Sequence, residues 1–86
     1  MQVETILGVF QLDSEGWHNP DTYDLLQCLG QWKININRID EARKITESVG
    51  VMLHSMYHEE VFNEVSLNKI QAAANMAIRH LLNNIG

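Results

Sequence analysis

Two histidines, His54 and His58, have the spacing in this sequence that best suits metal chemistry. Four positions apart, they would share one face of a helix, with two glutamates directly after them. A zinc or iron site needs three or four ligands, and His18 and His80 lie in other predicted elements with no recognised spacing. Carboxylate-bridged metal bundles require the Glu-x-x-His signature on two helices, and the predicted helices do not carry it. We therefore expect solvated histidines, no metal and no cofactor.

The residues that could catalyse a reaction form no recognised arrangement. Acid–base catalysis needs carboxylates in a pocket that shifts their pKa values, and Glu59, Glu60 and Glu64 are expected to be solvated. The serines lie in no nucleophile-elbow sequence, and the glycines form neither a phosphate-binding loop nor a dinucleotide fingerprint. We expect no catalytic residue and no enzymatic activity, with a small enzyme as the least favoured alternative.

Length and composition indicate one small folded domain over residues 1–86. With 45% hydrophobic and 20% charged residues, the chain is too apolar for disorder. A chain of this length buries only roughly 60–65% of its unfolded surface, so its core is expected to be marginal. The one cysteine, Cys28, lies among leucines and is expected to be an inert thiol in the core.

Charge and apolar runs argue against several classes of partner. Eleven acidic against six basic residues give a formal net charge of −5, which disfavours nucleic-acid binding. The apolar stretches are far shorter than the roughly 18 residues that a bilayer crossing needs. The opening Met1-Gln2-Val3-Glu4 lacks the basic start of a signal peptide. We expect no membrane contact and a cytoplasmic location.

The first segment, residues 3–12, fits a helix or a strand. Its apolar residues have the spacing of one helical face: Val3, Ile6, Leu7 and Phe10. Dense β-branched residues and Gly8 favour a strand instead. We favour a short helix, followed by a loop over residues 13–18.

A long helix is expected from Asn19-Pro20-Asp21, with Asn19 as the N-cap and Pro20 in the first position. Its apolar residues alternate steps of four and three positions: Leu25, Leu29, Trp32, Ile36 and Ile39. The same steps extend to Met56, although Ser48-Val49-Gly50 offers a place to bend. Because apolar and polar residues alternate after Gly30, a strand over residues 31–37 is the alternative.

The last helix is expected from Ser66, which can cap it, to about Asn84. The run Ala72-Ala73-Ala74 would let a neighbouring helix approach closely. Together the segments predict an all-α fold, a small helical bundle of three or four helices built on a long antiparallel helical hairpin, with residues 20–57 against residues 66–85. Strands over residues 3–12 or 31–37 would make the fold α+β.

The stretch Asn19-Pro20, followed by Leu25-Leu26-Gln27 and Leu29, resembles the Asn-Pro start of helices in type III secretion needle and rod subunits. The resemblance implies a subunit that assembles into a particle. Those subunits usually end one helix later, whereas here a further predicted helix follows, so the chain is not identified as a member. Small secretion chaperones and phage-encoded inhibitors share this size and helical character.

Amphipathic helices of this length carry more apolar surface than a thin bundle covers by itself. We therefore expect a small non-enzymatic protein-binding or regulatory protein, such as an adaptor, inhibitor or chaperone-like protein, that binds a second copy or another protein. The alternative is a structural or assembly subunit of a secretion or virion particle. Because aromatic and methionine side chains are common in hot spots, the expected interface residues are Trp32, Ile36, Met52, Met56 and Tyr57.

Overall fold

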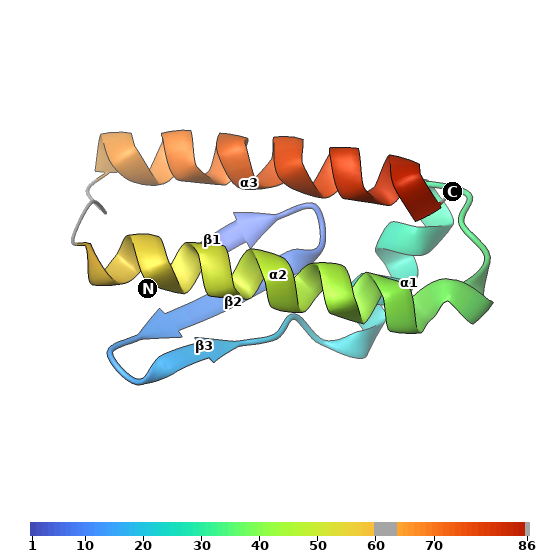
Figure 1. Cartoon of the computed structure of the whole chain (residues 1–86), viewed down its shortest axis with the longest axis horizontal. Coiled ribbons are helices and arrows are strands. Elements are labelled where there is room, and N and C mark those ends of the chain that lie inside the picture. Colours follow the sequence, from blue (N-terminus) through green and yellow to red (C-terminus); the bar gives the residue numbers. More distant parts are fainter. Residues whose placement is uncertain (60–63, 86) are drawn as a thin grey trace.

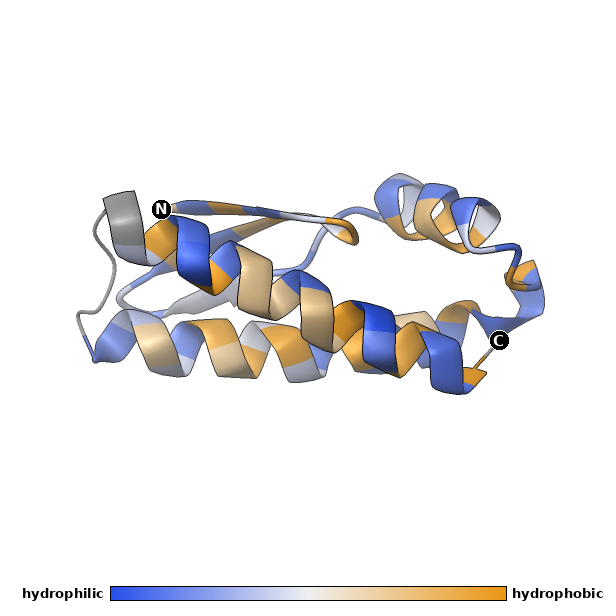
Figure 2. Cartoon of the chain, turned by 90° about the horizontal axis from the view of Figure 1, so that it is seen from above, coloured by the Kyte–Doolittle hydropathy of each residue, from blue (hydrophilic) through white to orange (hydrophobic). Residues whose placement is uncertain are grey.

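The chain folds into a three-stranded antiparallel sheet and three α-helices. This computed structural model describes residues 1–59 and 64–85. The elements in chain order are β1 (Gln2–Thr5), β2 (Gly8–Asp13), β3 (Gly16–His18), α1 (Thr22–Gln31), a 3-10 turn η1 (Ile36–Arg38), α2 (Ile39–His58) and α3 (Glu64–Ile85). The sheet and α1 form one layer, and α2 and α3 lie side by side as the second layer (Figures 1 and 2).

The sheet forms because apolar and polar residues alternate along its strands. Val3 of β1 lies opposite Phe10 of β2, and Leu12 of β2 lies opposite Trp17 of β3. Val3, Phe10 and Leu12 are buried on the side that α2 and α3 cover. The other side of the sheet is exposed, as period-two alternation requires: Glu4, Val9, Gln11, Asp13 and His18.

The helix predicted over residues 3–12 is therefore wrong. The apolar spacing that imitates a helical face arises because the chain reverses between β1 and β2, at Ile6 and Leu7, which brings Val3 opposite Phe10. The loop predicted over residues 13–18 is also wrong in its second half, which forms β3. The turn before β3 is closed by Asp13 Oδ1, which accepts from the Glu15 and Gly16 amides at 2.9 and 3.0 Å. These bonds, with that to Glu15 the strongest, hold the pKa of Asp13 below its usual value.

The outer edge of β1 is closed by two side chains of α3. Gln71 Oε1 accepts from the Glu4 amide and Asn75 Oδ1 from the Ile6 amide, both at 3.0 Å. Residues four apart on a helix rise about 6 Å and residues two apart on a strand about 6.8 Å, so the two pairs match. Two outward amides at this edge are therefore bonded within the chain, which hinders pairing with another strand.

The long helix predicted from residue 20 is two helices. Asp21, not Asn19, is the N-cap of α1, and its side chain accepts from the Asp24 amide at 2.8 Å. At the other end Lys33 adopts a left-handed backbone with φ 56°, and the Ile34 amide donates to Leu29 O at 2.9 Å. This pattern is a Schellman motif, which ends the helix. Because lysine occupies the position usually held by glycine, position 33 carries no local stop signal. The strand alternative over residues 31–37 is also wrong, because these residues form the end of α1, a turn and the start of η1.

Lys33→Gly is expected to raise the free energy of unfolding by about 0.5–1 kcal/mol, since glycine adopts the left-handed backbone without the Cβ penalty. Urea unfolding with an unchanged m value would measure this gain. Lys33→Ala is the matched control, because it removes the charged side chain and keeps the Cβ, and it should leave stability nearly unchanged. A Lys33→Gly protein less stable than Lys33→Ala would contradict the assignment.

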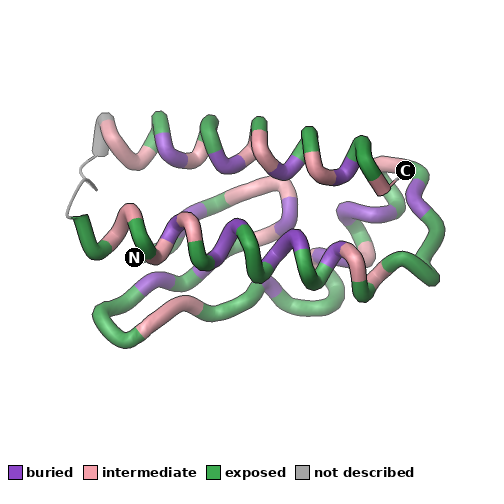
Figure 3. Tube along the Cα trace, in the orientation of Figure 1, coloured by how far each residue is buried: buried purple, intermediate pink, exposed green. Residues whose placement is uncertain are grey.

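The core lies between the sheet and the helical layer. On α2 the buried apolar residues are Ala42, Ile45, Val49 and Leu53, and on α3 they are Ile70, Ala74, Ile78 and Leu82. Figure 3 shows the buried turns of α3 facing α2 and its exposed turns on the opposite side. α2 continues without a break through Gly50, and Ser66 lies inside α3 instead of capping it.

The fold is a mixture of helices and a sheet, so the prediction of an all-α helical bundle or a coiled coil is wrong. The physical reason is that α2 and α3 bury their apolar faces against a sheet as well as against each other. Among the described helices, none combines the length and the apolar character that a membrane crossing demands.

Candidate functional site

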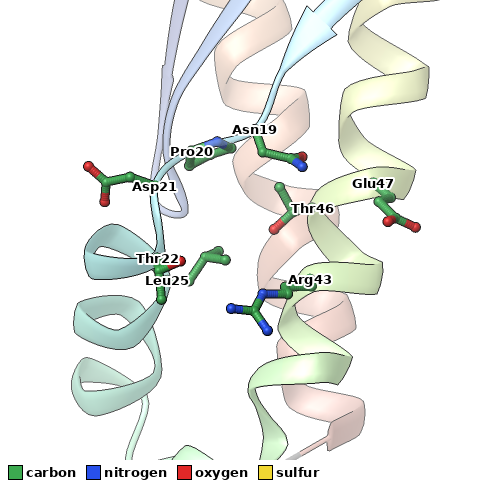
Figure 4. A pocket seen from close by; sticks show the side chains of 8 residues that line it. All are labelled: Asn19, Pro20, Asp21, Thr22, Leu25, Arg43, Thr46 and Glu47. Atoms are coloured by element: carbon green, nitrogen blue, oxygen red, sulfur yellow. The ribbon is translucent and has the colours of Figure 1, made fainter.

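A cavity of about 320 Å³ lies between the start of α1 and α2 (Figure 4). The loop between β3 and α1 forms part of its wall, because Pro20 is buried and holds this loop against the core. Leu25 of α1 and Thr46 of α2 are buried as well. The lining residues are Asn19, Pro20, Asp21, Thr22, Leu25, Arg43, Thr46 and Glu47.

Arg43 is the cationic group of this cavity. Its side chain extends from α2 toward α1, whereas the carboxylates of Asp21 and Glu47 point away from the space between the helices (Figure 4). Arg43 Nη1 donates to Asp40 Oδ1 at 3.3 Å, and the Arg43 side chain is 50% exposed. A half-exposed guanidinium that is already paired is screened by water, so the cavity offers only a weak electrostatic site for an anionic or polar group.

Other polar groups of the cavity are used by the fold itself. The Thr46 hydroxyl donates to Ala42 O at 2.9 Å, and the Asp21 carboxylate caps α1. Among the lining residues there is no histidine, cysteine or lysine, and no hydroxyl lies beside a base in the way that nucleophilic catalysis requires. The cavity is therefore suited to holding a small polar group.

The histidine pair at the end of α2 forms an aromatic cluster. The rings of His54 and His58 meet edge to face with centroids 4.3 Å apart, and Tyr57 stacks on His54 at 6.4 Å. His54 is half-buried instead of solvated, and its Nε2 is buried without a hydrogen-bond partner in the described part of the chain. Across residues 1–59 and 64–85, no three histidine, cysteine or acidic side chains come together as a metal site.

Cys28 lies in the core, as predicted. It is 2% exposed, and burial raises the pKa of its thiol, which disfavours the reactive thiolate. It also lines a hollow of about 180 Å³ beside Gly8 and Asp24. A protonated, buried sulfur is expected to act as a small apolar side chain.

The five residues predicted to form an interface lie toward opposite ends of the molecule. Trp32 and Ile36 lie at the junction of α1 and α2, whereas Met52, Met56 and Tyr57 lie in the last turns of α2. A 20-residue helix such as α2 is about 30 Å long, so the two groups do not form one surface. Ile36 is 61% exposed, and the other four are partly buried against the core.

A different exposed surface lies on α3, on the side away from α2. We call it the outer face of α3, and it consists of Lys69, Ala72, Ala73, Met76, Arg79 and His80, all exposed. Met76 is 70% exposed and stands at its centre, with small alanines one turn before it and basic residues one turn after it. A long apolar side chain raised above two small ones gives a neighbouring helix both a contact and room to approach.

Sequence reasoning found part of this surface and missed its centre. The run Ala72-Ala73-Ala74 was predicted to admit a neighbouring helix, and the structure divides it, with Ala74 buried in the core and the other two exposed. Met52 and Met56 drew attention because they continue an apolar stripe. Met76 lies opposite the apolar face of its helix, and a helical projection of residues 66–85 would have shown it.

The chain was compared with models of known protein families, with curated proteins and with solved structures. No match is found in any of the three comparisons. Function is therefore inferred from the surfaces of this chain alone.

Proposed function

We propose that this chain is a small non-enzymatic binding protein that docks to another protein through the outer face of α3 and so regulates, carries or positions it. The observation that supports the proposal is the exposure of Met76, 70%, at the centre of that face. Burying a methionine side chain fully contributes roughly 1.5–3 kcal/mol, so a partner that covers Met76 gains a substantial part of a binding energy.

The packing of the rest of the chain supports this choice of surface. Leu67, Leu81 and Ile85 are partly buried against the core, so they do not compete with Met76 for a partner. Ala72 and Ala73 permit a helix axis to come within about 8–10 Å of α3. Methionine also adapts its shape to different partners, which suits a binding surface.

The test is a comparison of two charge substitutions at exposed apolar residues. In an extract of the organism that produces the protein, wild type and Ile36→Glu should retain the same binding partner, whereas Met76→Glu should lose it, because a glutamate there would have to be desolvated on binding. Both side chains are more than 60% exposed, 61% for Ile36 and 70% for Met76, so thermal melting should show both variants folded. If Ile36→Glu loses the partner and Met76→Glu retains it, the interface lies at the α1–α2 junction and the proposed surface is wrong.

The second candidate function is an assembly subunit. Ile36 and Met76 are exposed apolar residues on different elements, and two distinct patches are what a head-to-tail assembly requires. Light scattering over a dilution series separates the two candidates. A binding protein stays at one defined size, whereas an assembly subunit grows with concentration.

A further inference from the structure

The outer face of α3 carries basic residues and no acidic ones. Between residues 65 and 85 the sequence contains Lys69 and Arg79 and no aspartate or glutamate. The two cations are ten positions apart, about 15 Å along the helix axis, on either side of Met76. In the part of the chain that the structure describes, the ion pairs are made by other basic residues. Both cations are therefore available to an incoming group.

This face differs in charge from the rest of the molecule. The formal net charge of the chain is −5, so without the positive charges of Lys69 and Arg79 the remainder carries −7. An acidic partner is repelled by most of the surface and attracted where these two cations lie. Such a difference between one face and the others favours one docking position over alternatives.

We propose that the partner of α3 is an amphipathic helix with a short apolar stripe flanked by carboxylates, which places its apolar side chains on Met76 and its acids near Lys69 and Arg79. This inference rests on the proposed function and specifies its partner. Ala72 and Ala73 let the two helices approach closely. The carboxylates of the partner then pair with Lys69 and Arg79 at the edges of the apolar contact.

A second copy of the chain fits this face less well. If two outer faces of α3 met, two copies of Lys69 and Arg79 would lie in the interface, and the helices themselves would offer no carboxylate between residues 65 and 85. Uncompensated like charges oppose association. A partner with its own acids removes this repulsion.

The experiment uses two synthetic helical peptides with the same leucine and alanine stripe, one flanked by glutamates and the other by lysines. The protein is labelled with ¹³C at the methionine methyl groups, so that Met76 reports the outer face of α3. Met1, Met52 and Met56 are the internal controls, because Met1 precedes β1 and the other two lie in the last half of α2. The glutamate peptide should shift the Met76 signal selectively and bind more weakly at high salt, and the lysine peptide should do neither.

Charge reversal provides the matched control. The variant Lys69→Glu/Arg79→Glu should bind the glutamate peptide about tenfold more weakly and should bind the lysine peptide instead, since two rim pairs become two like-charge contacts. Because both side chains are exposed, thermal melting should be close to wild type.

Three results would overturn the inference: equal binding of both peptides, shifts at Met52 or Met56 without Met76, or a Met76 shift that follows protein concentration alone, which would indicate a second copy. If neither peptide binds while Met76→Glu still abolishes partner retention, the acidic-helix partner is wrong and the proposed function stands. If Met76→Glu retains the partner as wild type does, the proposed function is wrong as well.

Discussion

Gly50→Ala is expected to lower the free energy of unfolding by about 2–3 kcal/mol, although alanine is the better helix former by about 1 kcal/mol. A Cβ at position 50 would lie 2.4–2.5 Å from three ring carbons of Trp17. Because Gly50 has no side chain, the indole of Trp17 in β3 packs directly on α2. It also lies beside Phe10, whose ring centroid is 6.1 Å away. The added methyl would push β3 away from the helix. Urea or thermal unfolding measures the loss.

Gly30→Ala in α1 is the matched control. It is also a helical glycine, but no heavy atom lies within 4 Å of a Cβ built there. The substitution should stabilise the protein by up to about 1 kcal/mol through helix propensity alone. If Gly50→Ala lowers the free energy of unfolding and Gly30→Ala raises it, the loss comes from the contact with Trp17. A Gly50→Ala protein at least as stable as wild type would show that Trp17 does not pack on α2.

Gly8→Ala is expected to cost about 2–4 kcal/mol, for two reasons that add. Gly8 has φ +122°, which side-chain-bearing residues rarely adopt. A Cβ there would also lie 2.7 Å from Asp24 Oδ2 and 2.8 Å from Pro20 Cβ. The Asp24 carboxylate can rotate away, but the buried Pro20 ring cannot, so the β1–β2 turn would have to separate from the start of α1.

Gly16→Ala is the matched control, which tests whether the cost of Gly8→Ala comes from the backbone conformation and contacts of Gly8. Gly16 begins β3, has no positive φ, and has open space where its Cβ would lie, so the substitution should change the unfolding free energy by less than about 0.5 kcal/mol. Adding Asp24→Ala to Gly8→Ala removes only the contact with Asp24 Oδ2, so the backbone strain and the contacts with Pro20 Cβ and Asp24 Cβ should keep most of the cost. If Gly8→Ala proves as mild as Gly16→Ala, the turn conformation assigned to Gly8 is wrong.

The features predictable from the sequence are those that depend on local spacing. The burial of Leu25, Cys28 and Leu29 followed from apolar residues about one turn apart, and all three are in the core. Strands over residues 3–12 were only the alternative to a favoured helix, because a short β1–β2 hairpin brings apolar residues together at intervals that also suit a helix. A pattern of so few residues does not distinguish the period of a helix from that of a strand.

Other features depend on contacts between distant residues, which no local pattern encodes. Gly50 in Ser48-Val49-Gly50 predicted a bend in the helix, yet the helix is continuous there and the glycine makes room for Trp17, 33 positions earlier in the chain. Lys33 ends α1 although it lacks the flexibility of glycine. The predicted interface residues were chosen by residue type and apolar stripe, and neither shows that they lie toward two ends of the molecule.

The hydrogen bond from the Ile6 amide to Asn75 joins residues 69 positions apart. Translation adds about 5–20 residues per second, so Asn75 is synthesised about 3–14 s after Ile6. Until α3 is made, the outer edge of β1 is open and the part of the apolar side that α3 covers is exposed. The protection against strand association described for the mature fold is therefore absent until α3 has been synthesised, and until then the edge of β1 can pair with another strand.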